Sequence, residues 1–230
     1  MDTRTTGDIP LLSLVPSLPA QSFEDIQMLF ETLKGVTHGV QVDIVDGVFA
    51  PHTSWPFTEV NVHTALTRLA SYTDFDIEID CMCMHPEDYL DQFSKVGVKR
   101  VVIHAGSTER YDECIRHART HRYRIGFGML NTTPTALQDM YIPQFDFVQV
   151  MGIEHVGVQG QPFDVRTLET IRTLRAHYPA REIAVDGSVN EATIMALLEA
   201  GATRFAPGSA ITKSVNPVAS YEQLARMVGL

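Results

Sequence analysis

The chain has 230 residues and a formal net charge of −10, and its length suits one domain with a sizeable core, which we expect to span residues 1–230. The acidic balance argues against a main role in binding nucleic acid, which needs clustered Lys and Arg, but it leaves room for a small anionic substrate. Three cysteines are too few for a disulfide framework, and we find neither a membrane-spanning apolar run nor a signal-peptide core, so we expect a cytoplasmic protein without membrane contact.

Short apolar runs alternate with helical patterns along the whole chain. Strands are predicted at residues 11–18, 39–47, 75–82, 98–106, 124–131, 146–152, 182–188 and 203–210. A predicted helix follows each strand, at residues 22–35, 59–72, 86–97, 109–122, 135–142, 164–178, 190–201 and 216–228. Ser22 and Asn190 are the expected N-caps of two of these helices, and Gly35 and Gly201 are their expected stops.

The repeated strand-then-helix order predicts a parallel sheet covered by helices. Eight such units most simply close into a (β/α)₈ TIM barrel of the α/β class. An open, doubly wound sheet is the alternative, but no Gly-x-Gly-x-x-Gly turn follows the first strand.

Polar residues interrupt the apolar strands near their carboxyl ends, where a barrel of this kind carries its active site. They are Ser17, Gln41, Asp43, Asp80, His104, Asn131 and Asp186. The alternation of side chains along a strand places Gln41 and Asp43 on one face. By the same rule Glu78, Asp80 and Met82 share a face, and we expect both faces to point into the mouth of the barrel.

Three late loops are rich in glycine and follow the sixth, seventh and eighth strands. Their glycines and serines are Gly157, Gly160, Gly187, Ser188, Gly208 and Ser209. Glycine lets the backbone approach a ligand closely, and backbone N–H groups can bind an anion without any lysine. Because the loops after strands seven and eight are the usual phosphate position of such barrels, we expect a phosphate group there.

The pieces VPSL, VDIVDGVFAP, PEDYL, MLNTTP, QGQPF, VDGSVN and AGATRFAPGSAI occur in this order over nearly the whole chain, which in this respect resembles the ribulose-phosphate 3-epimerases. The resemblance implies a cytoplasmic homo-oligomer of pentose phosphate metabolism that epimerises a phosphorylated ketose at C3. It assigns the two acid–base groups to Asp43 and Asp186 and a substrate contact to Ser17. It assigns the phosphate to the loops at 157–160, 187–188 and 208–209. His104 is a further candidate for binding the substrate.

Epimerisation beside a ketone also requires such a pair on chemical grounds. A proton leaves one face of the carbon and another returns to the opposite face. The reaction therefore needs two groups on opposite sides of a flat enediolate, one ionised and one protonated. Asp43 and Asp186 belong to strands that are distant along the sequence, and we expect them to approach the mouth from separate places.

The sequence departs from the family where the resemblance implies a divalent metal held by two histidines and the two aspartates. Gln41 and Asp80 stand at the histidine positions, which makes the chain a divergent member. Gln41, Asp43, Asp80 and Asp186 would offer only oxygen ligands. The candidate ions are Mg²⁺, Mn²⁺ and Zn²⁺, and of these the oxygen set suits Mg²⁺ or Mn²⁺ better, because Zn²⁺ favours imidazole. Without a cation, we expect at least one of the three carboxyl groups to hold a proton at neutral pH.

Two other functions are open on the sequence alone. Lyases and decarboxylases of the same barrel superfamily also use oxygen-rich metal sites, which Asp80 would fit. Their usual Asp-x-Lys-x-x-Asp stretch is absent from the third strand, which reads EIDCMCM. The loss of both histidines would also fit a protein that binds a sugar phosphate without turning it over.

Overall fold

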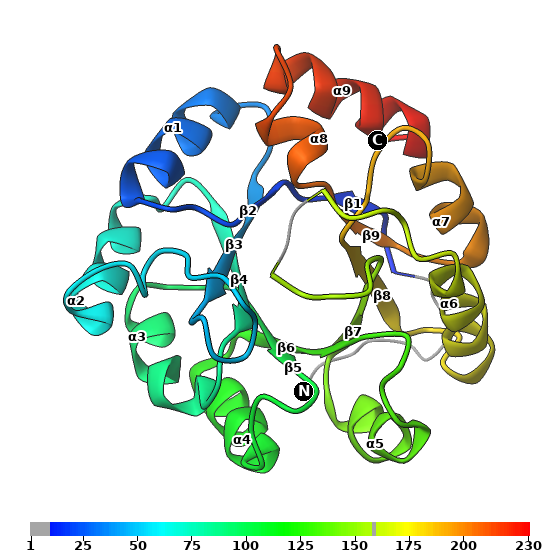
Figure 1. Cartoon of the computed structure of the whole chain (residues 1–230), viewed down its shortest axis with the longest axis horizontal. Coiled ribbons are helices and arrows are strands. Elements are labelled where there is room, and N and C mark those ends of the chain that lie inside the picture. Colours follow the sequence, from blue (N-terminus) through cyan, green and yellow to red (C-terminus); the bar gives the residue numbers. More distant parts are fainter. Residues whose placement is uncertain (1–9, 158–159) are drawn as a thin grey trace.

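The computed structural model describes residues 10–157 and 160–230, and in this part of the chain the strands form one parallel sheet in the order β1-β9-β8-β7-β6-β5-β4-β3-β2. Figure 1 shows the sheet as a ring with the helices outside it, which confirms the predicted (β/α)₈ TIM barrel. The strands are β1 (Ser13–Leu14), β2 (Ser17–Leu18), β3 (Gly39–Val45), β4 (Asp76–Met82), β5 (Arg100–His104), β6 (Arg124–Met129), β7 (Phe147–Met151), β8 (Glu182–Asp186) and β9 (Arg204–Ala206).

The first barrel strand closes the ring and is split into β1 and β2. On one side the N–H of Val15 donates to the carbonyl of Phe205 (2.8 Å). On the other side the N–H of Gln41 donates to the carbonyl of Pro16 (2.8 Å). Because proline has no N–H to donate, the ladder is interrupted at Pro16 and the predicted strand at 11–18 appears as two short pieces.

The predicted helices are found, with shifts at their ends. They are α1 (Phe23–Leu33), α2 (Val62–Leu66), η1 (Thr67–Ser71), η2 (Pro86–Tyr89), α3 (Leu90–Lys95), α4 (Tyr111–His121), α5 (Thr135–Tyr141), η3 (Ile142–Gln144), α6 (Arg166–His177), α7 (Ile194–Ala200), α8 (Ser209–Thr212) and α9 (Pro217–Val228). Ser22 caps α1 as expected, since its hydroxyl accepts the N–H of Asp25 while the Asp25 carboxylate accepts the N–H of Ser22.

Two predicted boundaries are wrong. Asn190 does not cap α7, because residues 190–193 form a separate turn in which its side chain accepts the N–H of Ala192 (2.9 Å), and the cap position falls to Thr193. The last predicted strand ends at Ala206 instead of continuing to residue 210, because the chain after Pro207 turns into α8.

The core lies between the sheet and the helices and contains large side chains that are fully buried, such as Trp55, Phe30 and Phe127. Among residues 10–157 and 160–230, no helix is both long and apolar enough to cross a membrane.

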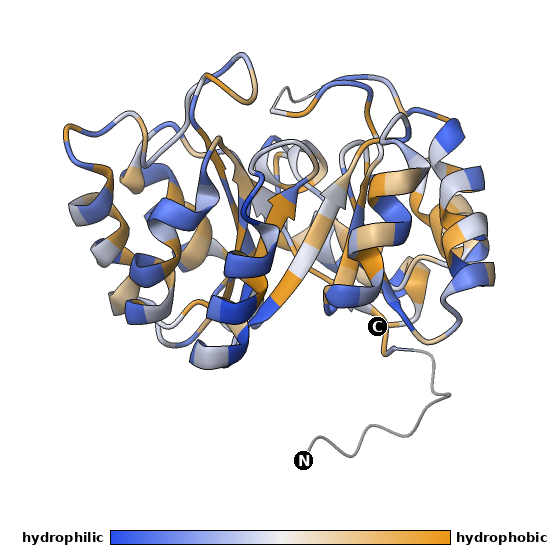
Figure 2. Cartoon of the chain, turned by 90° about the horizontal axis from the view of Figure 1, so that it is seen from below, coloured by the Kyte–Doolittle hydropathy of each residue, from blue (hydrophilic) through white to orange (hydrophobic). Residues whose placement is uncertain are grey.

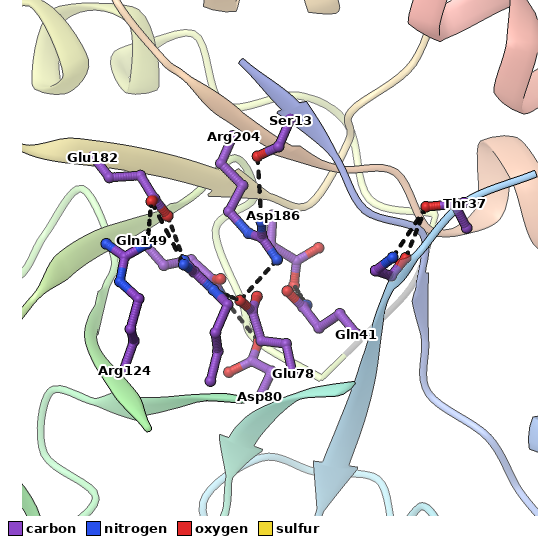
Figure 3. A network of polar contacts seen from close by, with 12 residues as sticks. Ser13, Thr37, Gln41, Glu78, Asp80, Arg124, Gln149, Glu182, Asp186 and Arg204 are labelled. Atoms are coloured by element: carbon purple, nitrogen blue, oxygen red, sulfur yellow. Dashed lines mark hydrogen bonds and ion pairs between the residues drawn. The ribbon is translucent and has the colours of Figure 1, made fainter. Parts of the chain in front are cut away.

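Glu78 lies near the amino-terminal end of the barrel interior, so its predicted place at the mouth is wrong. It pairs with Arg100 and with Arg204, whose nearest nitrogen is 3.0 Å away (Figure 3). Arg100 also pairs with Glu182, and Arg124 lies 2.6 Å from the same carboxylate. The other four charged residues are the first residues of their strands, Glu78 is the third residue of β4, and together they form the floor of the barrel.

The carboxyl ends of the strands lie at the end of the barrel opposite the floor, where barrels of this kind carry their active sites. All the strands are parallel, so their carboxyl ends meet at one end, and Figure 2 shows the strand arrows pointing toward the loops that rise there. The segment that follows β7, yellow-green in Figure 1, crosses the middle of the ring. These loops enclose the space above the strand ends.

Candidate active site

A cavity of about 280 Å³ opens at the carboxyl ends of the strands. Of the predicted catalytic and substrate-binding residues, all but His104 line it: Ser17, Asp43, Gly157, Gly160, Asp186, Gly187, Ser188, Gly208 and Ser209. Residues 158 and 159, in the middle of one predicted phosphate loop, lie outside the described residues. Met82, which shares the predicted face of Asp80, lines the cavity and forms an apolar wall with Met151 and Ile153. Sequence reasoning missed Met151, Ile153, Gln161 and Asn190.

The two predicted acid–base residues face the same cavity from β3 and β8. The side-chain amide of Gln41 joins them, because its nitrogen donates to Asp43 Oδ1 (3.0 Å) and to Asp186 Oδ2 (3.2 Å). The other oxygen of Asp186 accepts the N–H of Gly187 (2.7 Å). Asp43 is 5 % exposed and Asp186 6 % exposed, so both carboxyl groups are almost withdrawn from water.

Asp80 lies beside Asp43 in the register of β3 and β4 and is fully buried. One of its oxygens is 2.6 Å from Nε2 of His104, and the other accepts from the amide nitrogen of Gln149 (2.9 Å). His104 therefore supports Asp80 beneath the cavity. Sequence reasoning missed Gln149, although it interrupts the apolar strand FVQVM in the same way that Gln41 interrupts β3 (Figure 3).

Burial and mutual repulsion perturb the two acid–base groups. Desolvation raises the pKa of Asp43 well above its ordinary value, and the charges of Asp186 and Asp80 add to this effect. Desolvation and the charge of Asp80 raise the pKa of Asp186 to about 7. Burial and repulsion thus favour the protonated form of Asp43, while Asp186, with a pKa of about 7, is partly ionised near neutral pH.

The end of β3 is fixed by a serine that sequence reasoning did not single out. The hydroxyl of Ser54 donates to the carbonyl of Asp43 (2.9 Å) and accepts the N–H of Val45 (2.9 Å). Ser54 is buried and lies in an irregular loop, where its type and spacing give no signal.

The His104 ring fits inside the barrel because the residue paired with it on β6 is a glycine, which has no side chain to occupy the same space. A Cβ at Gly128 would lie 2.7 Å from Nδ1 of His104, well inside any real contact distance.

The loops after β7 and β8 are tied together above Asp186. Gly187 has φ +92°, and a Cβ there would lie 2.8 Å from the Ile153 side chain, so a larger residue would not fit. The hydroxyl of Ser188 donates to the carbonyl of Gln161 (2.6 Å). The serine thus joins the two loops, and its hydroxyl hydrogen is used within the protein.

The three aspartates also form a candidate metal centre. Asp43, Asp80 and Asp186 each offer one oxygen, and these oxygens lie within 4.8 Å of one another. Beside them, Oε1 of Gln41 is buried without a hydrogen-bond partner, and turning the amide would direct this oxygen toward the carboxylates. An all-oxygen set of this kind fits a hard cation such as Mg²⁺ or Mn²⁺.

Barrels that carry acid–base groups at this end and glycine-rich loops on their last strands are a broad class of enzymes. Within that class, the sequence model of the Ribulose-phosphate 3 epimerase family matches residues 11–212, and the chain belongs to this family. Its members named ribulose-phosphate 3-epimerase include proteins of Schizosaccharomyces pombe, 28 % identical over 89 % of this chain and 88 % of theirs, and of Mycobacterium bovis, 28 % identical over 94 % and 93 %.

Solved structures share the fold at lower sequence identity. The 3-hexulose-6-phosphate synthase of Salmonella typhimurium superposes with a TM-score of 0.72, at 14 % identity over 94 % of this chain and 98 % of that one. KGPDC from Streptococcus mutans gives a TM-score of 0.73 at 11 % identity over 95 % of this chain and 98 % of that one. At these identities the likeness supports the barrel fold.

Proposed function

We propose that the chain epimerises a phosphorylated ketose, of the ribulose 5-phosphate type, at C3. The observation that carries this proposal is the pair of Asp43 and Asp186. Two buried carboxyl groups from distant strands line one cavity, and burial raises the pKa of each, that of Asp186 to about 7. Such a pair can hold one proton between two sites, which is what proton exchange at a carbon requires.

In the proposed reaction Asp186 is the base at neutral pH and Asp43 is the acid. The ionised Asp186 removes the proton from C3, and the electrons of the C–H bond move into the enediolate over C2 and C3. Asp43 then gives its proton to the opposite face of C3, which inverts that carbon. After one turnover the pair again holds one proton, which now lies on Asp186, and the roles are exchanged in the reverse direction. Before another turnover in the same direction, proton exchange with water must return the pair to its starting state.

The glycine-rich loops after β7, β8 and β9 support the phosphorylated character of the substrate. They line the same cavity beyond Asp186, and no Lys or Arg occurs among the described residues that line it. A phosphate would therefore depend on backbone N–H groups and on the hydroxyl of Ser209.

Asp43, Asp80, Asp186 and the turned amide of Gln41 would hold a divalent cation at the floor of the cavity. A bound Mg²⁺ or Mn²⁺ would supply positive charge beside the oxygens of the enediolate. The chain itself supplies the hydrogen bonds that orient the carboxyl groups, from Gln41, Gly187 and Gln149.

The test is exchange of the C3 hydrogen. Pentulose 5-phosphates and hexulose 6-phosphates are incubated with the protein in D₂O, with and without Mg²⁺ or Mn²⁺, and deuterium at C3 is measured by NMR. We expect incorporation with one of them and a loss of about 10²–10⁴-fold in Asp43→Asn and in Asp186→Asn. Asp139→Asn, on the exposed face of α5, is the matched control and should exchange at the wild-type rate.

Two results would contradict the proposal in different ways. Release of formaldehyde or CO₂ without exchange at C3 would favour a lyase or decarboxylase. Thermal stabilisation by a sugar phosphate that persists in Asp43→Asn, with no turnover in the wild type, would favour a binding protein without catalysis.

A further inference from the structure

A second group of metal-ligating side chains lies in the outer layer of helices, apart from the mouth of the barrel. It consists of Asp91 near the start of α3 and of His117 and His121 on α4. His117 and His121 are four residues apart, so they project from the same face of the helix. One ligand atom from each of the three residues lies within 4.8 Å of the other two.

The contacts of His117 already resemble those of a metal ligand. Its Nε2 lies 3.0 Å from Oδ1 of Asp91, and its Nδ1 lies 3.0 Å from the hydroxyl of Tyr123. Histidines that bind metals usually use one ring nitrogen for the metal and the other for a hydrogen bond that fixes the ring. When Nδ1–H donates to the buried Tyr123, Nε2 carries the free electron pair and faces Asp91.

The second imidazole stands parallel to the first. The rings of His117 and His121 are stacked, with centroids 4.2 Å apart and planes inclined by 20°. His121 is the last residue of α4 and is exposed, and Asp91 is exposed as well. Both side chains can therefore move the short distance that brings three ligands to the roughly 2.0–2.2 Å of a zinc ion.

We propose that Asp91, His117 and His121 form a surface site for a borderline divalent ion such as Zn²⁺, with the remaining coordination position open to water. Two imidazoles and one carboxylate suit such an ion, whereas Mg²⁺ prefers oxygen ligands alone. The bound ion would link α3 to α4. The neighbouring Lys95 already attracts Asp91, so the ion must compete with this cation for the carboxylate.

A purely structural explanation makes a different prediction about His121. The contact of His117 with Asp91 connects α3 and α4 without any help from His121. If the group only ties the helices together, replacing His121 should change nothing. If the group binds zinc, replacing His121 removes one of the three ligands and leaves the contact between His117 and Asp91 intact.

The experiment is calorimetric titration of the full-length protein with Zn²⁺, and separately with Mg²⁺, in the wild type, His121→Ala and His177→Ala. His177 is the matched control, because it is also an exposed histidine at the last position of a helix, α6. We expect the wild type and His177→Ala to bind one more Zn²⁺ than His121→Ala, and all three to respond alike to Mg²⁺. The zinc that His121→Ala still binds reports any ion held by the aspartates of the mouth, which the three proteins share.

Thermal unfolding gives a second readout. At a free zinc concentration 100 times the Kd of the site, the unfolding equilibrium of the wild type should shift about 100-fold toward the native state, a shift that His121→Ala lacks. Without zinc, the two proteins should melt at the same temperature. Equal zinc stoichiometry and equal zinc-induced stabilisation in the wild type and His121→Ala would overturn the proposal.

Discussion

Asp43 is a single carboxyl group buried in the middle of an apolar strand, and its surroundings explain how the fold tolerates it. Its neighbours Val42 and Ile44 point to the apolar layer outside the barrel and are fully buried, while Asp43 points inward. Removing a carboxylate from water is costly unless it is compensated, and here the raised pKa of Asp43 allows the group to keep its proton. Burial thus supplies the protonated partner that the proposed reaction needs.

Gln41 is the residue whose replacement should shift the proton affinity of the pair. Its hydrogen bonds lower the pKa of both Asp43 and Asp186 and so partly offset their burial. In Gln41→Leu we expect the pKa of Asp186 to rise further above about 7, so that less of it is ionised at pH 7. The pH–rate profile should move to higher pH, with kcat/KM reduced about tenfold at pH 7 and largely recovered at pH 9. Gln223→Leu, on the exposed side of α9, is the control and should leave the pH–rate profile unchanged. An equal loss of kcat/KM at every pH in Gln41→Leu would show that Gln41 does not act through the pKa of Asp186.

Asp186→Asn should make the fold more stable at neutral pH while it slows exchange at C3 by about 10²–10⁴-fold. The folded-state pKa of about 7 lies above the ordinary 3.8, so the ionised group destabilises the fold increasingly from pH 3.8 up to about 7. Asparagine carries no such cost, and we expect a gain of about 2–4 kcal/mol at pH 8 that vanishes below pH 4. Urea unfolding in the presence of a chelator measures it. An equal gain at both pH values would show that the charge of Asp186 is not its source.

For the helices and strands, the sequence pattern predicts whether a segment is a helix or a strand better than it predicts how far along the barrel axis each side chain lies. The order of strands and helices follows from apolar periodicity, and glycine stops such as Gly201 mark helix ends correctly. The alternation that places Glu78 and Asp80 on one face cannot say how far along the barrel axis each lies. The predicted place of Glu78 is therefore wrong. Gln149 escapes sequence reasoning because, unlike Gln41, it stands at no position to which the family resemblance assigns a ligand.

Gly128 in β6 lies so close to the His104 ring that no larger residue should fit there. Gly128→Ala would force its Cβ against the His104 ring, which holds Asp80. We expect a loss of about 1–3 kcal/mol in the free energy of unfolding, together with a lower kcat, because overpacking displaces neighbouring side chains. Gly39→Ala, in β3, is the matched control, since its Cβ would meet Val15 at an ordinary 3.4 Å. Denaturant unfolding and the C3 exchange assay measure both effects, and similar results for the two variants would contradict the steric explanation.

Across the whole molecule, the pKa values of buried acidic groups shift in opposite directions at the two ends of the barrel. At the floor, burial would raise the pKa of Glu182, but the charges of Arg100 and Arg124 outweigh it and lower that pKa to about 2. At the mouth no arginine or lysine lines the cavity among the described residues, and the pKa of Asp186 rises to about 7. The ionised form of Glu182 therefore stabilises the fold, whereas the ionised form of Asp186 lowers its stability and is suited to proton transfer.

The strand β8 begins with Glu182 at the floor and ends with Asp186 at the mouth, so the lowered and the raised pKa can be compared within one strand. Glu182 and Asp186 lie about 13 Å apart along the strand, far enough for their effects to add. The folded-state pKa of Glu182 is depressed from 4.5 to about 2, so its ionised form stabilises the fold above pH 4.5, and this contribution is lost as the pH falls toward 2. We expect Glu182→Gln to cost about 2–3 kcal/mol at pH 7 and almost nothing near pH 2, the opposite sign to Asp186→Asn. Urea titrations of the two single variants and the double variant between pH 2 and 8 measure this, and a Glu182→Gln protein as stable as the wild type at pH 7 would refute the assigned division between floor and mouth.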